Sequence, residues 1–134
     1  MSFALSPRTA RGEAVVAAAS SLVEALAQRA QAADAANAVS RENFDELIRN
    51  GIASAFVPEE LGGFGLESIH DWILTITTLA RGDASTAIAI NMHLVVSRAM
   101  VQAYSDAKAR LGADHRTTHG LAQRATPMAI TWRP

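Results

Sequence analysis

An all-α fold, a helical bundle of about four main helices, is predicted by three features of this sequence. Apolar residues recur every three or four positions in four segments, as they do on one face of a helix. Glycine, proline and asparagine separate these segments. No segment shows the strict alternation of a half-buried strand. The chain has 134 residues, 49% of them hydrophobic and 19% charged, which predicts one folded domain with one core.

A first helix is predicted over residues 13–34, behind a flexible N-terminus of residues 1–12. Alanine is abundant here, which favours a helix intrinsically and lets a neighbour approach closely. The apolar positions fall in threes and fours and so form one stripe: Val15, Val16, Ala19, Leu22, Val23, Leu26, Ala27 and Ala30.

A second helix is predicted between Ser40 and Asn50. The Ser40 hydroxyl can accept a hydrogen bond from a backbone N–H of the first turn. Phe44, Leu47 and Ile48 then make one apolar stripe, and residues 50–51 are the Asn-Gly pair at which helices commonly stop.

The segment 58–65, Pro-Glu-Glu-Leu-Gly-Gly-Phe-Gly, is too rich in glycine to be helical and is predicted to be a structured loop. It lacks the G-x-G-x-x-G pattern of a phosphate-binding turn, and no strand precedes it. We therefore interpret its glycines as structural.

A third helix is predicted over residues 67–80. Thr75, Thr77 and Thr78 lower its intrinsic propensity, so packing must hold it. Its apolar face consists of Ile69, Trp72, Ile73, Ile76 and Leu79.

A fourth helix is predicted from Asp83 or Ser85, either of which can cap it, to Tyr104. It is apolar nearly all round, so we expect it to lie at the centre of the bundle. It is long enough to resemble a membrane span, but Asn91, His93 and other polar groups within it would be costly in lipid. The more basic residues 106–134 are predicted to form a divergent, partly disordered tail.

Composition excludes several other classes of function. Twelve basic and thirteen acidic residues give a net charge of −1, so neither nucleic acid nor membrane is expected as a partner. The absence of cysteine excludes disulfides but leaves the compartment open, and the N-terminus has no secretory signal pattern, so the expected location is cytoplasmic. His115 and His119 have the spacing of a metal pair but lack a third ligand, so no metal site is expected.

Two stretches resemble the N-terminal helical domain of the acyl-CoA dehydrogenase superfamily. They are residues 44–65, FDELIRNGIASAFVPEELGGFG, and residues 79–94, LARGDASTAIAINMHL. In that family a helix ends in a Gly-Ile step, a PEE-x-GG-x-G loop follows, and two helices meet at a Gly-Asp-x-Ser corner. The resemblance covers residues 13–105 and ends before the tail, which departs from the family pattern.

The resemblance implies a larger protein in which a β-domain and a C-terminal four-helix bundle follow this domain. It implies FAD as cofactor, held largely by those two domains and a neighbouring subunit, and a catalytic carboxylate in the C-terminal part. It also implies acyl-CoA or another small molecule as substrate and a homo-oligomer in full-length relatives. Because residues 106–134 match neither later domain, this chain alone is expected to lack a complete flavin site and to be inactive.

His93 is the sequence's main candidate for chemistry. Ser85, Ala89, His93 and Ser97 recur every four residues, so they form a small and polar strip that could line a pocket. In flavin monooxygenases of this fold a histidine of the N-terminal domain can act as acid or base, which imidazole suits near neutral pH. The competing interpretation is a satisfied structural histidine.

The resemblance also places the glycine loop at the edge of an acyl pocket, which makes Phe64 and Leu66 candidate substrate contacts. Three functions stay open. The leading one is an acyl-CoA dehydrogenase-like oxidoreductase acting on CH–CH groups, in which this domain helps to wall the acyl and flavin pocket. The second is a flavin-dependent monooxygenase of the same fold. The third is a non-catalytic fragment or an oligomerising helical module.

Overall fold

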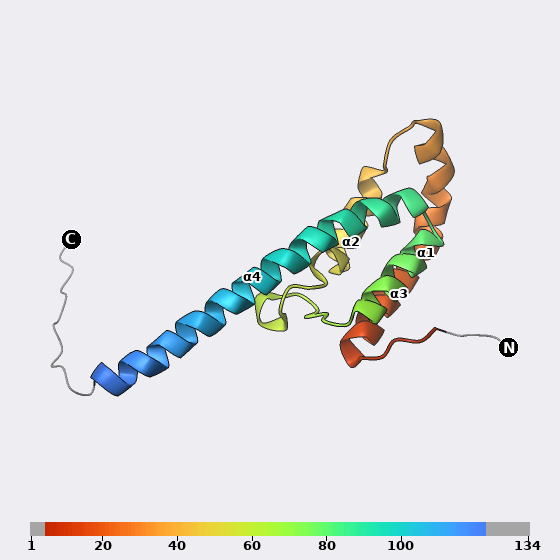
Figure 1. Ribbon diagram of the computed structural model, residues 1–134. Helices are drawn as coiled ribbons and strands as arrows, with labels where there is room; N and C mark the ends of the chain where they lie inside the picture. Colours follow the sequence, from red (N-terminus) through yellow and green to blue (C-terminus); the bar gives the residue numbers. More distant parts are fainter. Residues whose placement is uncertain (1–4, 123–134) are drawn as a thin grey trace. The chain divides into compact units, whose positions relative to one another are not determined.

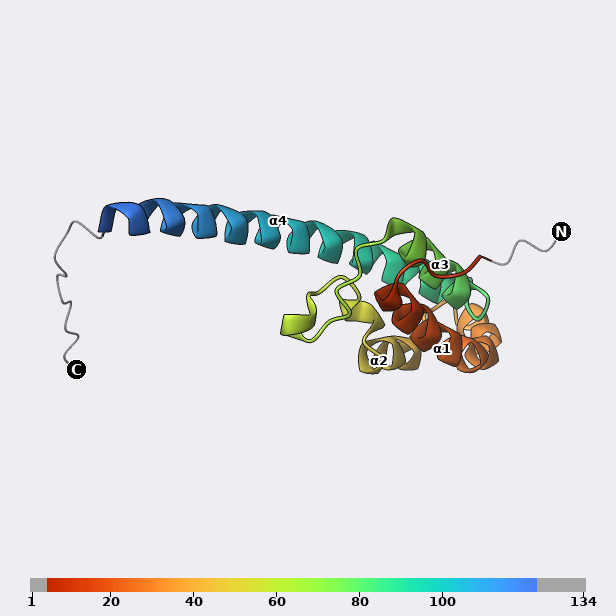
Figure 2. The same ribbon diagram turned by 90° about the horizontal axis from the view of Figure 1, so that it is seen from below.

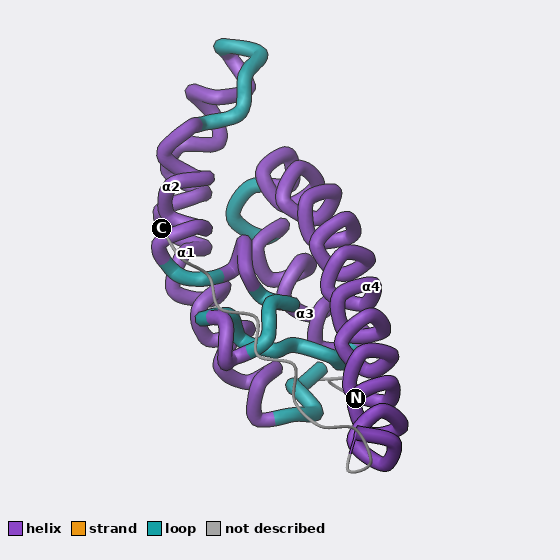
Figure 3. Tube along the Cα trace, turned by 90° about the vertical axis from the view of Figure 1, so that its left-hand side faces the viewer, coloured by secondary structure: helices purple, strands orange, loops and turns teal. Residues whose placement is uncertain are grey.

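The computed structural model describes residues 5–122 of the chain, with side chains described for residues 5–112. Every regular element in this range is a helix, which confirms the predicted all-α fold (Figures 1 and 3). The chain divides into two compact units, Met1–Val101 and Gln102–Pro134. The α-helices are α1 (Ala10–Ala35), α2 (Arg41–Arg49), α3 (Ile69–Ala80) and α4 (Ala84–Ala122), and two short 3-10 helices are η1 (Ile52–Ser54) and η2 (Glu59–Leu61).

Helix α1 begins three residues earlier than predicted because Thr9 caps it. The Thr9 hydroxyl accepts a hydrogen bond from the Gly12 N–H at 2.9 Å. The buried residues of α1 are Gly12, Val15, Ala19, Leu22 and Leu26, spaced in threes and fours as predicted.

Helix α2 has the predicted bounds, but one of its predicted end contacts is wrong. Ser40 is the N-cap residue, yet its side chain makes no capping hydrogen bond. The C-terminal prediction is confirmed, because the backbone of Gly51 has a φ of 76°, in the left-handed region that a side chain disfavours.

Helix α3 buries only part of the predicted face: Leu79 is fully buried, and Trp72 and Ile76 pack half-buried against the core. Its buried residues are Asp71, Thr75, Thr78 and Leu79, whereas Ile69 and Ile73 are exposed, at 53% and 58%. The threonines can face the neighbouring α1 because their hydroxyls donate to the carbonyl oxygens of Asp71 and Leu74, at 2.7 Å in both cases. Figures 1 and 2 show α3 running alongside α1.

Helix α4 begins where predicted, since the Asp83 carboxylate accepts a hydrogen bond from the Ser85 N–H at 3.0 Å. The prediction that it is buried all round is wrong. Up to Val101 it buries one side only, through Ala87, Ile90 and Leu94, while five large apolar residues are exposed: Ile88, Met92, Val95, Val96 and Met100. Within the described residues it is also the one helix that is long and apolar enough to span a membrane. The core helices of soluble proteins can have the same length and apolarity.

The helix continues to Ala122, so residues 106–122 are helical where the sequence predicted a partly disordered tail. Alanine, lysine and arginine are strong helix formers, and no proline interrupts this stretch. Within the second unit, the Lys108 ammonium lies 5.9 Å from the Tyr104 ring centre, and the Gln102 amide donates to Asp106 at 2.9 Å. Residues 123–134 of the predicted tail lie outside the described residues.

The core of the first unit draws on all four α-helices and on the loop between α2 and α3. The loop contributes Ile52, Ala55, Phe56 and Leu66, and the rings of Phe56 and Trp72 meet edge to face, 5.1 Å apart. The remaining buried apolar residues are Val15, Ala19, Leu22 and Leu26 of α1, Leu47 of α2, Leu79 of α3, and Ala87, Ile90 and Leu94 of α4.

Candidate functional site

His93 is tethered to the loop that follows α2. Its Nε2 lies 2.9 Å from the carbonyl oxygen of Ala53 in η1 and 3.2 Å from the hydroxyl oxygen of Ser97, one turn along α4. Ala53 packs against the core, so the carbonyl is a fixed point, while the imidazole itself is exposed. The structure therefore brings together two of the predicted strip residues, His93 and Ser97.

The other two members of the strip differ in exposure. Ala89 is half-buried and Ser85 is exposed, and the Ser85 backbone N–H belongs to the cap of α4. The strip is thus an open surface, and its ordered polar group is His93 with its two partners, the Ala53 carbonyl and the Ser97 hydroxyl.

The glycine loop is occupied by its own hydrogen bonds. The N–H groups of Gly62, Gly63 and Gly65 donate to the carbonyl oxygens of Glu59, Pro58 and Val57, at 3.0, 3.2 and 2.8 Å. These donors are not free to cradle a phosphate. This accounts for the glycines as structural, as the sequence predicted.

Close packing explains why glycine is needed at position 63. A Cβ there would lie 2.1 Å from the Val57 carbonyl oxygen and 2.5 Å from that of Ser54, distances that real atoms do not reach. Backbone, not a flexible side chain, closes this space, so the loop cannot adjust locally.

Arg11 of α1 fixes the loop from outside. Its guanidinium pairs with Glu59 at 2.6 Å and with Glu67 at 3.3 Å, and it donates to the Gly65 carbonyl oxygen at 3.1 Å. Phe64 is half-buried and lines a cavity of about 280 Å³ whose wall also includes Arg11 and Glu59. Leu66 is only 3% exposed within the core, so the structure gives this predicted substrate contact no open surface.

A buried carboxylate, which the sequence analysis did not single out, joins the N-terminal segment to α3. Asp71 is fully buried and accepts hydrogen bonds from the Arg8 N–H at 2.8 Å, the Thr9 N–H at 3.1 Å and the Thr9 hydroxyl at 2.7 Å. Desolvation acts to raise the pKa of the Asp71 carboxyl, but the hydrogen bonds from Thr9, Arg8 and Ser68 outweigh it and hold that pKa below its ordinary value. Every acceptor contact is internal, so Asp71 stabilises the fold and is not presented to a ligand.

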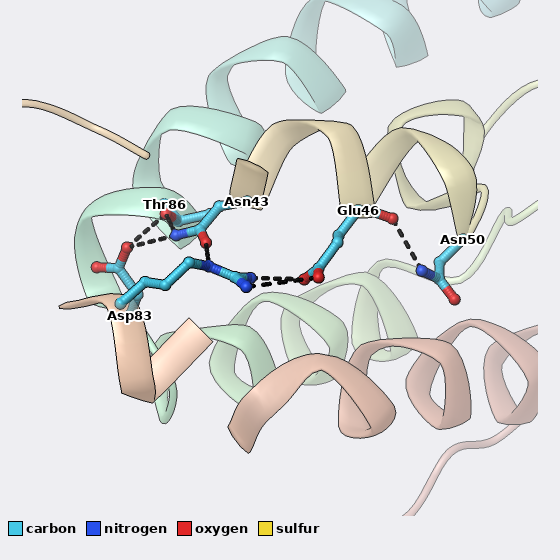
Figure 4. A network of polar contacts seen from close by, with 6 residues as sticks. Asn43, Glu46, Asn50, Asp83 and Thr86 are labelled. Atoms are coloured by element: carbon cyan, nitrogen blue, oxygen red, sulfur yellow. Dashed lines mark hydrogen bonds and ion pairs between the residues drawn. The ribbon is translucent and has the colours of Figure 1, made fainter. Parts of the chain in front are cut away.

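A second polar network links α1, α2 and the start of α4 (Figure 4). The Asn43 amide donates to Thr86 at 2.8 Å and to Asp83 at 3.2 Å, and its oxygen accepts from Arg29 at 2.6 Å. Arg29 also pairs with Glu46 at 2.6 Å. Asn43 and Thr86 are fully buried and their polar groups are all paired, so this network also holds helices together.

An apolar groove of about 240 Å³ lies along α3 and reaches α4. It is lined by Ile69, Trp72, Ile73, Ile76, Thr77 and Asn91. The buried indole N–H of Trp72 has no hydrogen-bond partner within the described residues. Together with the exposed residues of α4, this groove makes an apolar surface that the described chain leaves uncovered.

Metal ligands do not cluster in the described part of the chain: no three histidine or acidic side chains there could hold an ion. His115 and His119 lie outside the residues whose side chains are described.

Comparison with known proteins shows the family. Residues 9–111 match the N-terminal domain of acyl-CoA dehydrogenases, a slightly longer stretch than the predicted residues 13–105. The chain therefore belongs to the acyl-CoA dehydrogenase family, whose members are flavin-dependent oxidoreductases that usually bind FAD.

Individual relatives fall into two kinds. The chain is 33% identical over 98 residues to the L-evernosamine nitrososynthase of a Micromonospora species, which is 73% of this chain and 23% of that protein. It is 42% identical over 50 residues to an amino sugar nitrososynthase of Streptomyces peucetius, 37% of this chain and 12% of that protein. It is also 33% identical over 84 residues to the benzylmalonyl-CoA dehydrogenase of Aromatoleum aromaticum, 63% of this chain and 22% of that protein.

The chain thus spans about a quarter or less of the length of these relatives. No solved structure matches it significantly.

Sequence reasoning missed several contacts of this site. The Ala53 carbonyl gives no sequence signal, because any residue in that turn would present it. Asp71 does give one, since Ser68 and Asp71 have the S-x-x-D spacing of a helix start, and the Ser68 hydroxyl accepts from the Asp71 N–H at 3.2 Å.

Proposed function

We propose that this chain forms the N-terminal domain of a flavin-dependent enzyme that oxidises the amine nitrogen of a small, sugar-like molecule. Two observations support the proposal: the similarity to amino sugar nitrososynthases, and an exposed histidine held in one orientation by Ala53 and Ser97. The histidine is the observation that carries the chemistry, because amine oxidation needs a proton acceptor.

The role of His93 follows from the protonation state of amines. A primary amine is mostly protonated at neutral pH, and its nitrogen can react only after a proton leaves. An imidazole suits that transfer, since it changes charge near neutral pH. Oxygen and a reduced flavin are the co-reactants: one oxygen atom enters an N–H bond, the other leaves as water, and the flavin supplies two electrons.

The segment that most resembles a phosphate-binding turn does not fit the flavin. The glycine loop uses its N–H groups internally, so it offers no cradle for the flavin pyrophosphate. The proposal therefore assigns flavin binding to other parts of the intact enzyme, and assigns to this domain one wall of the pocket, with His93 on it.

Oxidation of a CH–CH bond in an acyl-CoA is the second function, supported by the similarity to benzylmalonyl-CoA dehydrogenase. It needs a carboxylate base, and the strip of Ser85, Ala89, His93 and Ser97 contains no acid. In that case the domain would only wall the acyl chain, and His93 would have no chemical part.

A pair of chimeras tests the two functions. Residues 9–111 replace the matching segment of the Micromonospora nitrososynthase and, separately, of the Aromatoleum dehydrogenase. We expect the first chimera to oxidise its amino sugar and the second to lose its dehydrogenase activity. A first chimera that folds and binds flavin yet cannot oxidise the amine, beside an active second one, would refute the proposal.

Flavin titration of the chain alone tests the assignment of flavin binding to other parts of the intact enzyme. Quenching of flavin fluorescence and co-elution of flavin on a sizing column report binding. We expect no stoichiometric binding, whereas a yellow complex would mean that this chain completes a site without further domains.

A further inference from the structure

The two nitrogen atoms of His93 have different surroundings, and the difference fixes which one carries hydrogen. A carbonyl oxygen only accepts hydrogen bonds, so the 2.9 Å contact between Nε2 and the Ala53 carbonyl requires the hydrogen on Nε2. The Ser97 hydroxyl oxygen, 3.2 Å away, faces the same nitrogen and can share that hydrogen. Nδ1 has no hydrogen-bond partner among the described residues.

The Ala53 carbonyl is available because the 3-10 turn does not use it. In this turn Ser54 and Ala55 donate to the carbonyl oxygens of Gly51 and Ile52, and Val57 donates to that of Ser54. The left-handed backbone of Gly51, with a φ of 76°, sets the direction in which the turn starts. The turn therefore presents one unused acceptor toward α4, where His93 meets it.

We propose that the Ala53 carbonyl is the positioning group of this site: it holds His93 as the Nε2–H tautomer and leaves Nδ1 as the nitrogen that accepts a proton. The assignment of that proton to a substrate amine rests on the proposed function, whereas the tautomer does not. Ser97 is a secondary partner that limits rotation of the ring.

Nitrogen-15 NMR of the 134-residue chain, labelled at histidine, tests the tautomer directly. The two ring nitrogens of neutral imidazole differ strongly in chemical shift, depending on which carries hydrogen. We expect His93 to show protonated Nε2 and bare Nδ1, both in the wild-type chain and after Ser97→Ala. A mixture of tautomers, hydrogen on Nδ1, or a change of tautomer in S97A would overturn the assignment to Ala53.

His70 is an internal comparison, because its Nε2 lies 3.0 Å from the Ser6 carbonyl oxygen without a hydroxyl partner. It should show the same tautomer, and His93→Gln identifies the His93 signals by their loss.

Substitution of His93 by glutamine or by asparagine distinguishes the roles of the two ring nitrogens, because the two amides reach different positions. A glutamine amide extends about as far as Nε2 and can donate to the Ala53 carbonyl, whereas the amide of asparagine reaches only the position of Nδ1. We expect His93→Gln to keep the wild-type melting temperature within about 2 °C and His93→Asn to lower it by about 4–8 °C, the cost of one lost hydrogen bond. Equal melting temperatures of H93Q and H93N would contradict the tether.

The H93Q substitution in the Micromonospora chimera tests the proton transfer separately. Glutamine keeps the tether but has no basic nitrogen, so H93Q should lose about 10²- to 10⁴-fold in turnover with its fold intact. Full activity of H93Q would remove the chemical role of His93 while leaving the tautomer assignment standing. Failure of the NMR test would remove the assignment whatever the chimera does.

Discussion

Replacing Asp71 by alanine is expected to cost the domain about 3 kcal/mol of stability, because three hydrogen-bond donors lose their acceptor. These are the N–H groups of Arg8 and Thr9 and the Thr9 hydroxyl, each at 2.7–3.1 Å from the carboxylate. At about 1 kcal/mol for each donor left without an acceptor, the sum is a large part of the free energy of unfolding of a typical domain, about 5–15 kcal/mol.

Thermal unfolding followed by circular dichroism measures this loss. For a domain of this size 1 kcal/mol corresponds to about 4–8 °C, so Asp71→Ala should melt about 12–24 °C below the wild type. Glu67→Ala is the matched control: this carboxylate also has a partner, the Arg11 guanidinium, but it is 88% exposed and should change stability by less than about 0.5 kcal/mol.

The lowered pKa of Asp71 sets the direction in which its contribution to stability changes with pH. The folded-state pKa is lowered from 3.8, so the unfolded chain binds the proton more readily. The stabilisation is fully present above 3.8 and is lost as the pH falls through the lower folded pKa. The gap between wild type and Asp71→Asn should therefore be constant near neutral pH and shrink below 3.8. A gap that is unchanged at low pH, or a D71A variant as stable as E67A, would refute the reasoning.

Two further predictions concern the loop and the uncovered surface. Gly63→Ala should unfold or strongly destabilise the domain because its Cβ meets the Val57 carbonyl oxygen, whereas Gly62→Ala, with open space but a φ of 86°, should cost only about 1–2 kcal/mol in chemical denaturation. Equal effects would contradict the packing argument. The uncovered apolar surface is expected to drive self-association, which Ile73→Lys with Met92→Lys should reduce. Light scattering measures the change, and the melting temperature should not fall, because these side chains are 58% and 62% exposed. Unchanged association would mean that this surface is not what drives it.

Much of the fold could be predicted from local chemistry alone. The spacing of Val15, Ala19, Leu22 and Leu26 gives α1 its buried face whatever surrounds it. The Asn-Gly end of α2 and the glycine loop follow from backbone sterics, which act within a few residues. The order of these signals was also enough to indicate the family, which the match over residues 9–111 confirms.

Burial of the last two helices could not be predicted in this way. Periodicity locates an apolar stripe but does not identify the surface that covers it. In α3 Thr75 and Thr78 can be buried because their hydroxyls bond within the helix, whereas Ile69 and Ile73 stay exposed. In α4 the apolar residues nearly encircle the helix, but the described chain covers one side only.

For the candidate site, too, some features follow from the sequence and others only from the tertiary structure. The sequence by itself determined the helical class, the loop and the strip that carries His93, because each depends on residues close together in the chain. Only the tertiary structure decided that an Ala53 carbonyl, 40 residues away, holds the imidazole, and that Asp71 bonds the backbone more than 60 residues before it. In each contact one partner is a backbone group, which almost every residue has, so the sequence does not identify that partner, and the contact exists only once the helices have packed.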